Sequence, residues 1–202
     1  MSAEFAGGGF VRAASETEAA AQVGKTAPDF SLPATNGKTV DLKQYKGKIV
    51  VLEWFNHGCP FVKKHYNSNN MQTLQKEYTG KGVVWLSICS SAKGNQGYAS
   101  AAEHDAEVKA NKAAPTAVLM DEDGKVGRLY GAKTTPDMYV IDKKGELVYC
   151  GAIDDHSDTD VESIKSSKNY VKEALDELLA GKAVATSSTK SYGCSVKYKK
   201  EG

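Results

Sequence analysis

The chain has 202 residues, of which 41% are hydrophobic and 25% are charged, and its formal net charge is +1. This composition is typical of one folded domain with some tail, and the near-neutral charge argues against a nucleic-acid partner. No apolar run approaches the roughly 20 residues that a bilayer crossing needs, so we expect no membrane span.

Residues 1–24 are small, polar and rich in Ala and Gly, with almost no large apolar side chain. Such a segment cannot build a core, so we expect a flexible arm. It also lacks the apolar region of a signal peptide. The compartment is therefore unknown: the chain as it stands is expected to be soluble and cytoplasmic, and the bacterial periplasm stays open if a signal peptide was removed.

The folded part is expected to begin with a hairpin over residues 30–42, where two alternating segments flank an Asn-Gly turn. The apolar run at 49–55 then predicts a central strand that is buried on both faces. A helix is expected from Pro60, because proline fits the first helical turn, with a break at 67–70.

The rest of the chain repeats these patterns. Further buried strands are expected at 83–89, 117–120, 138–142 and 146–150. Further helices are expected at 98–111, 126–130 and 161–179. Strands that alternate with helices and end in a hairpin indicate an α/β fold with a mixed central sheet. We expect one domain over 25–180 and a mobile C-terminal tail over 181–202.

The four cysteines, Cys59, Cys89, Cys150 and Cys194, show no C-x-x-C spacing, so we expect no metal site and no cofactor. Cys59 lies where a buried strand ends and a helix begins. Free N–H groups and the helix dipole at such a point lower the pKa of a thiol. Cys59 is therefore the predicted nucleophile, and an inert buried cysteine is the alternative. Cys89 and Cys150 are expected to act as small apolar groups.

Three segments resemble the thioredoxin superfamily, and within it the redoxins of the AhpC/TSA peroxiredoxin-like and TlpA-like type. Residues 52–60 (Leu-Glu-Trp-Phe-Asn-His-Gly-Cys-Pro) resemble the family's strand and active-site loop. Residues 134–142 resemble the strand that carries its cis-proline, and 145–149 resemble its closing strand. The resemblance covers about 24–180 and implies a thioredoxin-like three-layer α/β/α sandwich with an N-terminal hairpin and a cis-proline strand.

The resemblance also implies where substrates bind. In the family the cis-proline packs beside the reactive sulfur and leaves neighbouring backbone open to a partner chain; here that proline is Pro136. Side chains around it and around Cys59 are expected to complete the surface. The expected substrate-binding residues are Trp54, His57, Pro60, Thr135 and Pro136. Trp54 packed into the core is the alternative for that residue.

Two further side chains near Cys59 are titratable. Glu53 stands where thioredoxins carry a buried acid, and burial would raise its pKa, which suits a proton shuttle. A Glu53 that reaches solvent or a lysine is the alternative. His57, when charged, would stabilise a thiolate; otherwise it is an exposed loop residue. His65 is expected on a helix surface, and 154–156 as a solvated loop.

The chain departs from both family patterns. Val62 stands where thioredoxins have their second cysteine, so Cys59 cannot form the usual local disulfide. Leu52 and Asn56 stand where peroxiredoxins have Pro and Thr or Ser, and Pro136 falls where their arginine is expected. Peroxide reduction needs donors that polarise the O–O bond, so a standard peroxidase site is doubtful.

Cys194 follows a glycine in the tail and could fold back onto an oxidised Cys59, the resolving role. A stray thiol or an intermolecular crosslink is the alternative. The predicted function is thiol–disulfide oxidoreductase, acting on protein or small-molecule disulfides with an external thiol as reductant. Two alternatives stay open: a peroxiredoxin-like peroxidase that acts on peroxides through Cys59 and Cys194, and a redox-inactive binding module.

Overall fold

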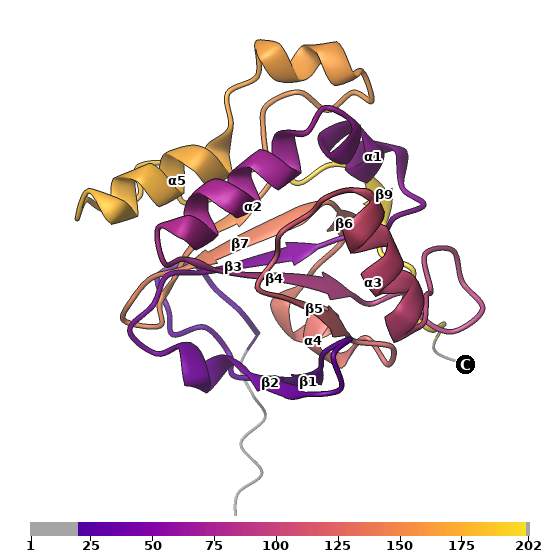
Figure 1. The fold of residues 1–202 in the computed structure, drawn as a ribbon. Coiled ribbons are helices and arrows are strands. Elements are labelled where there is room, and N and C mark those ends of the chain that lie inside the picture. The colour runs from indigo at the N-terminus through magenta and orange to yellow at the C-terminus, as the bar shows by residue number, and fades with distance from the viewer. Residues whose placement is uncertain (1–19, 201–202) are drawn as a thin grey trace, which may run out of the picture.

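The computed structural model describes residues 20–200, and its centre is a five-stranded sheet in the order β5-β4-β3-β7-β8 (Figure 1). Strand β3 (Val50–Trp54) runs parallel to β4 (Val84–Cys89), which runs parallel to β5 (Ala117–Met120). On its other side β3 pairs antiparallel with β7 (Asp137–Ile141), and β7 with β8 (Leu147–Gly151). The expected mixed sheet is confirmed.

Every residue of β3, β4 and β7 is buried, which explains their near-continuous apolar sequences. Side chains alternate between the two faces of a strand, so Val51 and Phe55 enter one core and Leu52 and Trp54 the other. Two separate cores therefore flank the sheet, and consecutive residues near the end of β3 face opposite ways.

One core is covered by three helices, α1 (Pro60–Asn67), α2 (Asn70–Gly80) and α5 (Tyr170–Leu179), which lie above the sheet in Figure 1. Helix α3 (Ala101–Ala110) lies beside β5, and its Val108 packs against the same core. Among residues 20–200 no helix is long and apolar enough to cross a bilayer.

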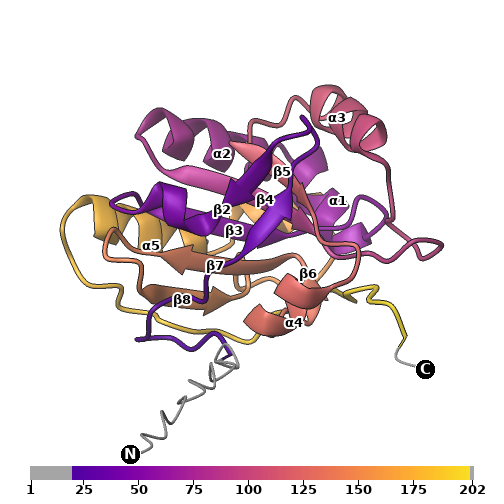
Figure 2. The ribbon, with the colours of Figure 1, turned by 90° about the horizontal axis from the view of Figure 1, so that it is seen from below.

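The other core is covered by a small hairpin and short helices, seen from below in Figure 2. Strand β1 (Ser31–Pro33) pairs antiparallel with β2 (Thr39–Asp41), as expected. The 3₁₀ helix η1 (Leu42–Tyr45) follows, and α4 (Lys125–Tyr130) contributes Val126 and Tyr130 to this core.

The expected break between α1 and α2 is confirmed, since Asn69 adopts a left-handed conformation with φ 63°. The single long helix expected at 161–179 is wrong. A 3₁₀ helix, η2 (Val161–Lys165), comes first, and α5 begins only at Tyr170. The Asn169 side chain accepts from the Lys172 N–H at 2.8 Å, so a helix cap interrupts the apolar pattern.

Most of the arm expected at 1–24 lies outside the described residues. Its last part is attached to the domain: the Ala21 amide donates to the Leu129 carbonyl at 3.0 Å, and the Gly24 amide to the Leu147 carbonyl at 2.8 Å. The folded domain thus begins before residue 25, where we expected its boundary.

The tail also differs from the expected mobile segment, because it docks along one edge of the domain. Its strand β9 (Cys194–Ser195) pairs antiparallel with β6 (Thr134–Thr135), which immediately precedes Pro136. We refer to residues 188–199 as the strap. Two of its tyrosines hold it down by contacts far along the sequence, which the apolar pattern of the tail does not indicate.

Candidate active site

The loop that presents Cys59 is shaped by Asn56. Its carboxamide oxygen accepts from the Gly58 amide at 2.7 Å, and its backbone carbonyl accepts from the Cys59 amide at 2.9 Å. Its Nδ2 donates to the Gln96 carbonyl at 3.1 Å, and the Gln96 side chain donates back to the Gly58 carbonyl at 3.2 Å. Asn56 is 1% exposed, so the turn before Cys59 is fixed by a buried side chain.

Cys59 is the N-cap residue of α1 and is fully buried. In the thiol form its Sγ donates to the Thr135 carbonyl oxygen at 3.0 Å. The Thr135–Pro136 peptide bond is cis, as expected. The buried Thr135 hydroxyl has no hydrogen-bond partner in the structure, and as a donor to the thiolate it lowers the pKa of Cys59. The Thr135 carbonyl thus accepts from the thiol form of Cys59, and the Thr135 hydroxyl is a donor to its thiolate form.

The strap brings Cys194 to the same place. Cys194 lies opposite Thr135 in the β6–β9 pair, and as a donor to the Cys59 thiolate its thiol lowers the pKa of Cys59. Gly193 makes this close approach possible: its φ is +129°, and a Cβ there would lie 2.1 Å from the Thr135 carbonyl oxygen. All four cysteines are thiols in the structure.

The contact separates the acidities of the two thiols. Burial by itself raises the pKa of Cys59, but donors from the Cys194 thiol, the Thr135 hydroxyl and the Val62 amide outweigh it and hold that pKa below its ordinary value. For Cys194, burial and the neighbouring Cys59 raise the pKa to about 11. At neutral pH Cys59 is the better nucleophile and Cys194 stays protonated.

Trp54 does not belong to this arrangement. Its side chain is fully buried in the core on the opposite face of the sheet, where its Nε1 donates to the Ser90 hydroxyl at 3.0 Å and its ring packs on Tyr139. It offers no surface to a substrate, because consecutive residues of β3 alternate faces. Pro60, by contrast, is exposed at the first turn of α1, next to Cys59.

Glu53 is fully buried on the same face of the sheet as Cys59 and accepts four hydrogen bonds, none of them from Cys59. The donors are Tyr66 Oη at 2.9 Å, Trp85 Nε1 at 2.8 Å, Ser87 Oγ at 2.8 Å and Gln75 Nε2 at 3.2 Å. Burial raises the pKa of Glu53 in spite of these donors. The carboxyl therefore joins β3, β4, α1 and α2 at one point.

His57 is not the charged partner of the thiolate that we considered. Burial lowers its pKa to about 4, so the imidazole is neutral at physiological pH. Its ring packs on Phe55, with centroids 4.7 Å apart, and on His104, with centroids 5.5 Å apart. An apolar environment of this kind disfavours the cation that stabilisation of Cys59 would need.

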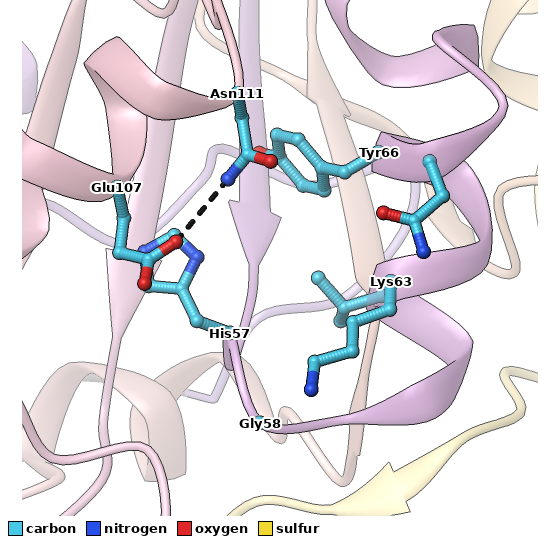
Figure 3. A pocket seen from close by; sticks show the side chains of 8 residues that line it. His57, Gly58, Lys63, Tyr66, Glu107 and Asn111 are labelled. Atoms are coloured by element: carbon cyan, nitrogen blue, oxygen red, sulfur yellow. Dashed lines mark hydrogen bonds between the residues drawn. The ribbon is translucent and has the colours of Figure 1, made fainter.

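His57 instead lines an open pocket of about 530 Å³ beside the Cys59 loop. Figure 3 shows Glu107 and Asn111, from the end of α3, across from Lys63 and Tyr66 of α1. The Asn111 amide donates to Glu107 at 3.4 Å. Gly58, which precedes Cys59, and Val62 and Asn67 of α1 also line the pocket, so it reaches the backbone of the active-site loop.

Comparison with known proteins identifies the family of this fold. A family model described as the AhpC/TSA family matches residues 23–150, more than half of the chain. The chain belongs to the AhpC/TSA family. It is a thioredoxin-fold redoxin, related to thiol–disulfide oxidoreductases of the ResA type and to peroxiredoxins.

Two curated relatives and one solved structure illustrate the relationship of this redoxin. The thioredoxin-like protein YneN of Bacillus subtilis is 31% identical over 66% of this chain and 73% of its own. The thiol–disulfide oxidoreductase ResA of Bacillus thuringiensis subsp. konkukian is 28% identical over 63% and 68%. The crystal structure of hypothetical protein SMc02350 from Sinorhizobium meliloti, 26% identical, superposes with a TM-score of 0.76 over 91% and 98% of the two chains.

The other two cysteines of the redoxin are unlike Cys59. Cys89 is buried, and its Sγ donates to the Gly97 carbonyl at 3.4 Å; burial raises its pKa. Burial also raises the pKa of Cys150, which is half-buried. Within residues 20–200, no three His, Cys, Asp or Glu side chains come together as a metal site would require.

Sequence reasoning missed part of the site. His65, expected on the helix surface, is fully buried, and Asp154, expected in a solvated loop, is 1% exposed. Both contact Tyr192 of the strap. The strap and the loop before η2 cover the outer face of α1, and neither apolar periodicity nor motif spacing indicates that cover. A tyrosine two residues before Cys194 was the available signal.

Proposed function

We propose that this redoxin is a thiol–disulfide oxidoreductase in which Cys59 is the nucleophile and Cys194 the resolving thiol. The observation that carries the proposal is the place of Cys194 opposite Thr135, whose carbonyl accepts from Cys59, and with it the pKa of Cys59 is lowered and that of Cys194 raised to about 11. A pair of this kind attacks with one thiol and holds the other protonated until it is needed.

The reaction begins when the Cys59 thiolate attacks one sulfur of a substrate disulfide. A Cys59–substrate bond forms as the substrate bond breaks, and the other substrate sulfur leaves as a thiolate that takes a proton from solvent. Cys194 then loses its proton and attacks Cys59 Sγ, which releases the second substrate thiol. The substrate is reduced by two electrons, the pair becomes a Cys59–Cys194 disulfide, and an external thiol restores it.

The surface around Pro136 is the proposed landing site for the substrate, with Thr135 and the exposed Pro60 at its border. Cys59 has no exposed surface while β9 is paired with β6. The strap must therefore move aside before a substrate disulfide can reach Cys59 Sγ. Its return places Cys194 against the mixed disulfide, so one movement serves both access and resolution.

A peroxidase is the second candidate, because a sulfenic acid on Cys59 would condense with Cys194 and release water just as readily. The described surroundings of the sulfur favour the first candidate. The donors at Cys59 are a thiol, a hydroxyl and backbone amides, whereas the guanidinium of Arg128 donates to the backbone carbonyls of Asp123 and of Lys199, at the other end of the strap. The lowered pKa of Cys59 argues against a redox-inactive module.

The test uses the full chain with Cys89→Ser and Cys150→Ser, so that only the proposed pair can react. Separate stopped-flow runs mix the reduced protein with a model disulfide or with hydrogen peroxide, follow Trp fluorescence, and map the products by mass spectrometry. We expect rapid disulfide exchange, slow peroxide reaction and a Cys59–Cys194 disulfide. Cys59→Ser should lose all reaction, and Cys194→Ser should stop at the mixed disulfide.

Rapid peroxide reaction with slow disulfide exchange would replace the first candidate by the peroxidase. Inertness toward both oxidants would leave only the binding module.

A further inference from the structure

The strap is anchored to the domain on both sides of Cys194, and the two anchors differ in their surroundings. On the far side, Tyr198 Oη donates to the Ala132 carbonyl at 2.7 Å, and the Val196 amide donates to the Lys133 carbonyl at 3.0 Å. On the near side, two residues before Cys194, the anchor is Tyr192. Both hydrogen-bond partners of the Tyr192 hydroxyl, His65 and Asp154, are buried.

The hydrogen bonds around Tyr192 run in one direction. Asn70 Nδ2 lies 2.9 Å from His65 Nδ1, so that nitrogen is the acceptor. Burial lowers the pKa of His65 to about 4, and the neutral ring then carries its proton on Nε2. Nε2 donates to Tyr192 Oη at 3.1 Å, and the Tyr192 hydroxyl in turn donates to Asp154 Oδ1.

The ring of Tyr192 is also confined. It packs on Phe61 of α1 with centroids 5.9 Å apart, and Lys64 Nζ lies 5.9 Å from its centroid. That ammonium is fully buried and bound to the His156 carbonyl at 2.7 Å and to Asp158 at 3.2 Å. The Tyr192 side chain is thus in contact with helix α1, which Cys59 caps, and with the loop before η2.

The backbone between Tyr192 and Cys194 has little conformational freedom. Gly193 alone separates Tyr192 from Cys194, and its backbone presses against the Thr135 carbonyl. Thr135 is the residue opposite Cys194 in the strand pair and also bonds Cys59. A shift of the Tyr192 hydroxyl is therefore passed to the Cys194 thiol over two residues of chain.

We propose that Tyr192 is the positioning residue of the Cys59–Cys194 pair: its hydroxyl, held between His65 and Asp154, keeps the Cys194 thiol against Cys59. The inference rests on the proposed function, in which the two thiols form a disulfide. Tyr192 itself touches no reacting atom, so its effect is on the effective concentration of Cys194 at Cys59.

The test replaces Tyr192→Phe in the full chain with Cys89→Ser and Cys150→Ser, and uses Tyr198→Phe as the matched control. Each protein is equilibrated with mixtures of reduced and oxidised glutathione, and the Cys59–Cys194 disulfide is quantified by mass spectrometry. Oxidised glutathione accepts the two electrons of the pair and leaves as two thiols. At half-oxidation the squared concentration of reduced glutathione divided by the concentration of oxidised glutathione gives the effective concentration directly.

We expect Tyr192→Phe to lower the effective concentration about tenfold, which makes the potential about 30 mV less reducing. Tyr198→Phe should leave it within about twofold, since its hydroxyl is bonded beyond Cys194. Asp154→Asn, which keeps one acceptor oxygen, should shift the potential in the same direction by less. No shift in Tyr192→Phe, or an equal shift in Tyr198→Phe, would overturn the inference.

A second readout does not need the disulfide to form. The pH profile of Cys59 alkylation by iodoacetamide should move to higher pH in Tyr192→Phe, because the Cys194 donor is no longer held at the sulfur. An unmoved profile contradicts the positioning role. If the parent protein forms no Cys59–Cys194 disulfide but the profile moves, the proposed function fails while the positioning of Cys194 by Tyr192 stands.

Discussion

Cys194 of β9 is a hydrogen-bond donor to the thiolate of Cys59, the N-cap residue of α1, and the two thiols shift each other's pKa. The interaction shifts the pKa values of the two thiols in opposite directions. It lowers the pKa of the acceptor and raises that of the donor, because a donor that gives up its proton loses the bond to its neighbour.

Replacing Cys194 therefore changes Cys59 even before any oxidant is added. A hydrogen bond to a charged group contributes about 1.5–3 kcal/mol, and one pKa unit corresponds to about 1.4 kcal/mol. In Cys194→Ala we expect the alkylation profile of Cys59 to be displaced to higher pH, with a rate at pH 7 that falls by up to about tenfold. Cys194→Ser keeps a donor and should stay near the parent profile; identical profiles for both variants would contradict the contact.

Much of the fold could be predicted from the sequence because its signals are local. The apolar run before Cys59, the proline after it and the Thr-Pro before β7 mark strand, helix start and cis bond, and the structure has all three. The path of the strap could not be predicted. Its anchors are hydroxyls, Tyr192 and Tyr198, whose partners lie far away in the chain, and short-range periodicity carries no information about them.

The misplacement of His65 has the same physical origin. On α1 the side chains of Val62 and Tyr66 face the core, and His65, three residues after Val62, lies at the border of that face. The segment around η2 packs onto the outer side of α1, and the strap closes over it. Burial of His65 is thus completed by tertiary contacts, whereas the helix pattern by itself predicts a residue at the edge of the buried face.

Replacing His57 should have no effect on the reactivity of Cys59. Its pKa is lowered to about 4 by burial, so it carries no charge at pH 7 and cannot favour the thiolate by attraction. His57→Gln should therefore change the rate of Cys59 alkylation at pH 7 by less than about twofold and leave its pH profile in place. A profile displaced to higher pH would show that the imidazole is cationic after all.

His104 should make the fold sensitive to acid. The residue is 1% exposed, its Nδ1 has no hydrogen-bond partner, and burial lowers its pKa to about 4, below the ordinary 6.5. Between these values the unfolded chain binds the extra proton, so stability present above pH 6.5 is lost as pH falls toward 4. The loss from this group is up to about 3 kcal/mol.

His104→Phe removes this titration and keeps a ring against Phe55. Urea unfolding at pH 7 and at pH 4.5 should show a smaller difference between the two pH values for the variant than for the parent. At pH 7 the variant should be within about 1 kcal/mol of the parent, because a buried unpaired nitrogen is exchanged for apolar surface. An unchanged pH difference would mean that another group carries the acid sensitivity.

Glu53→Gln separates two roles of a buried carboxyl. The folded pKa of Glu53 is raised, so above its ordinary range the native state binds more protons than the unfolded state, and stability falls as pH rises through that window. Urea unfolding from pH 4.5 to 8 should show that the stability of the parent relative to Glu53→Gln declines as pH rises.

The rate of disulfide exchange decides whether Glu53 also moves protons. Its two oxygens already accept from Tyr66, Gln75, Trp85 and Ser87, and Cys59 is not among the donors. We therefore expect exchange in Glu53→Gln to stay within about threefold of the parent, whereas loss of a working general acid or base costs 10²–10⁴-fold. A loss of that size, with an intact fold by circular dichroism, would restore the shuttle and require a proton path from the carboxyl to Cys59.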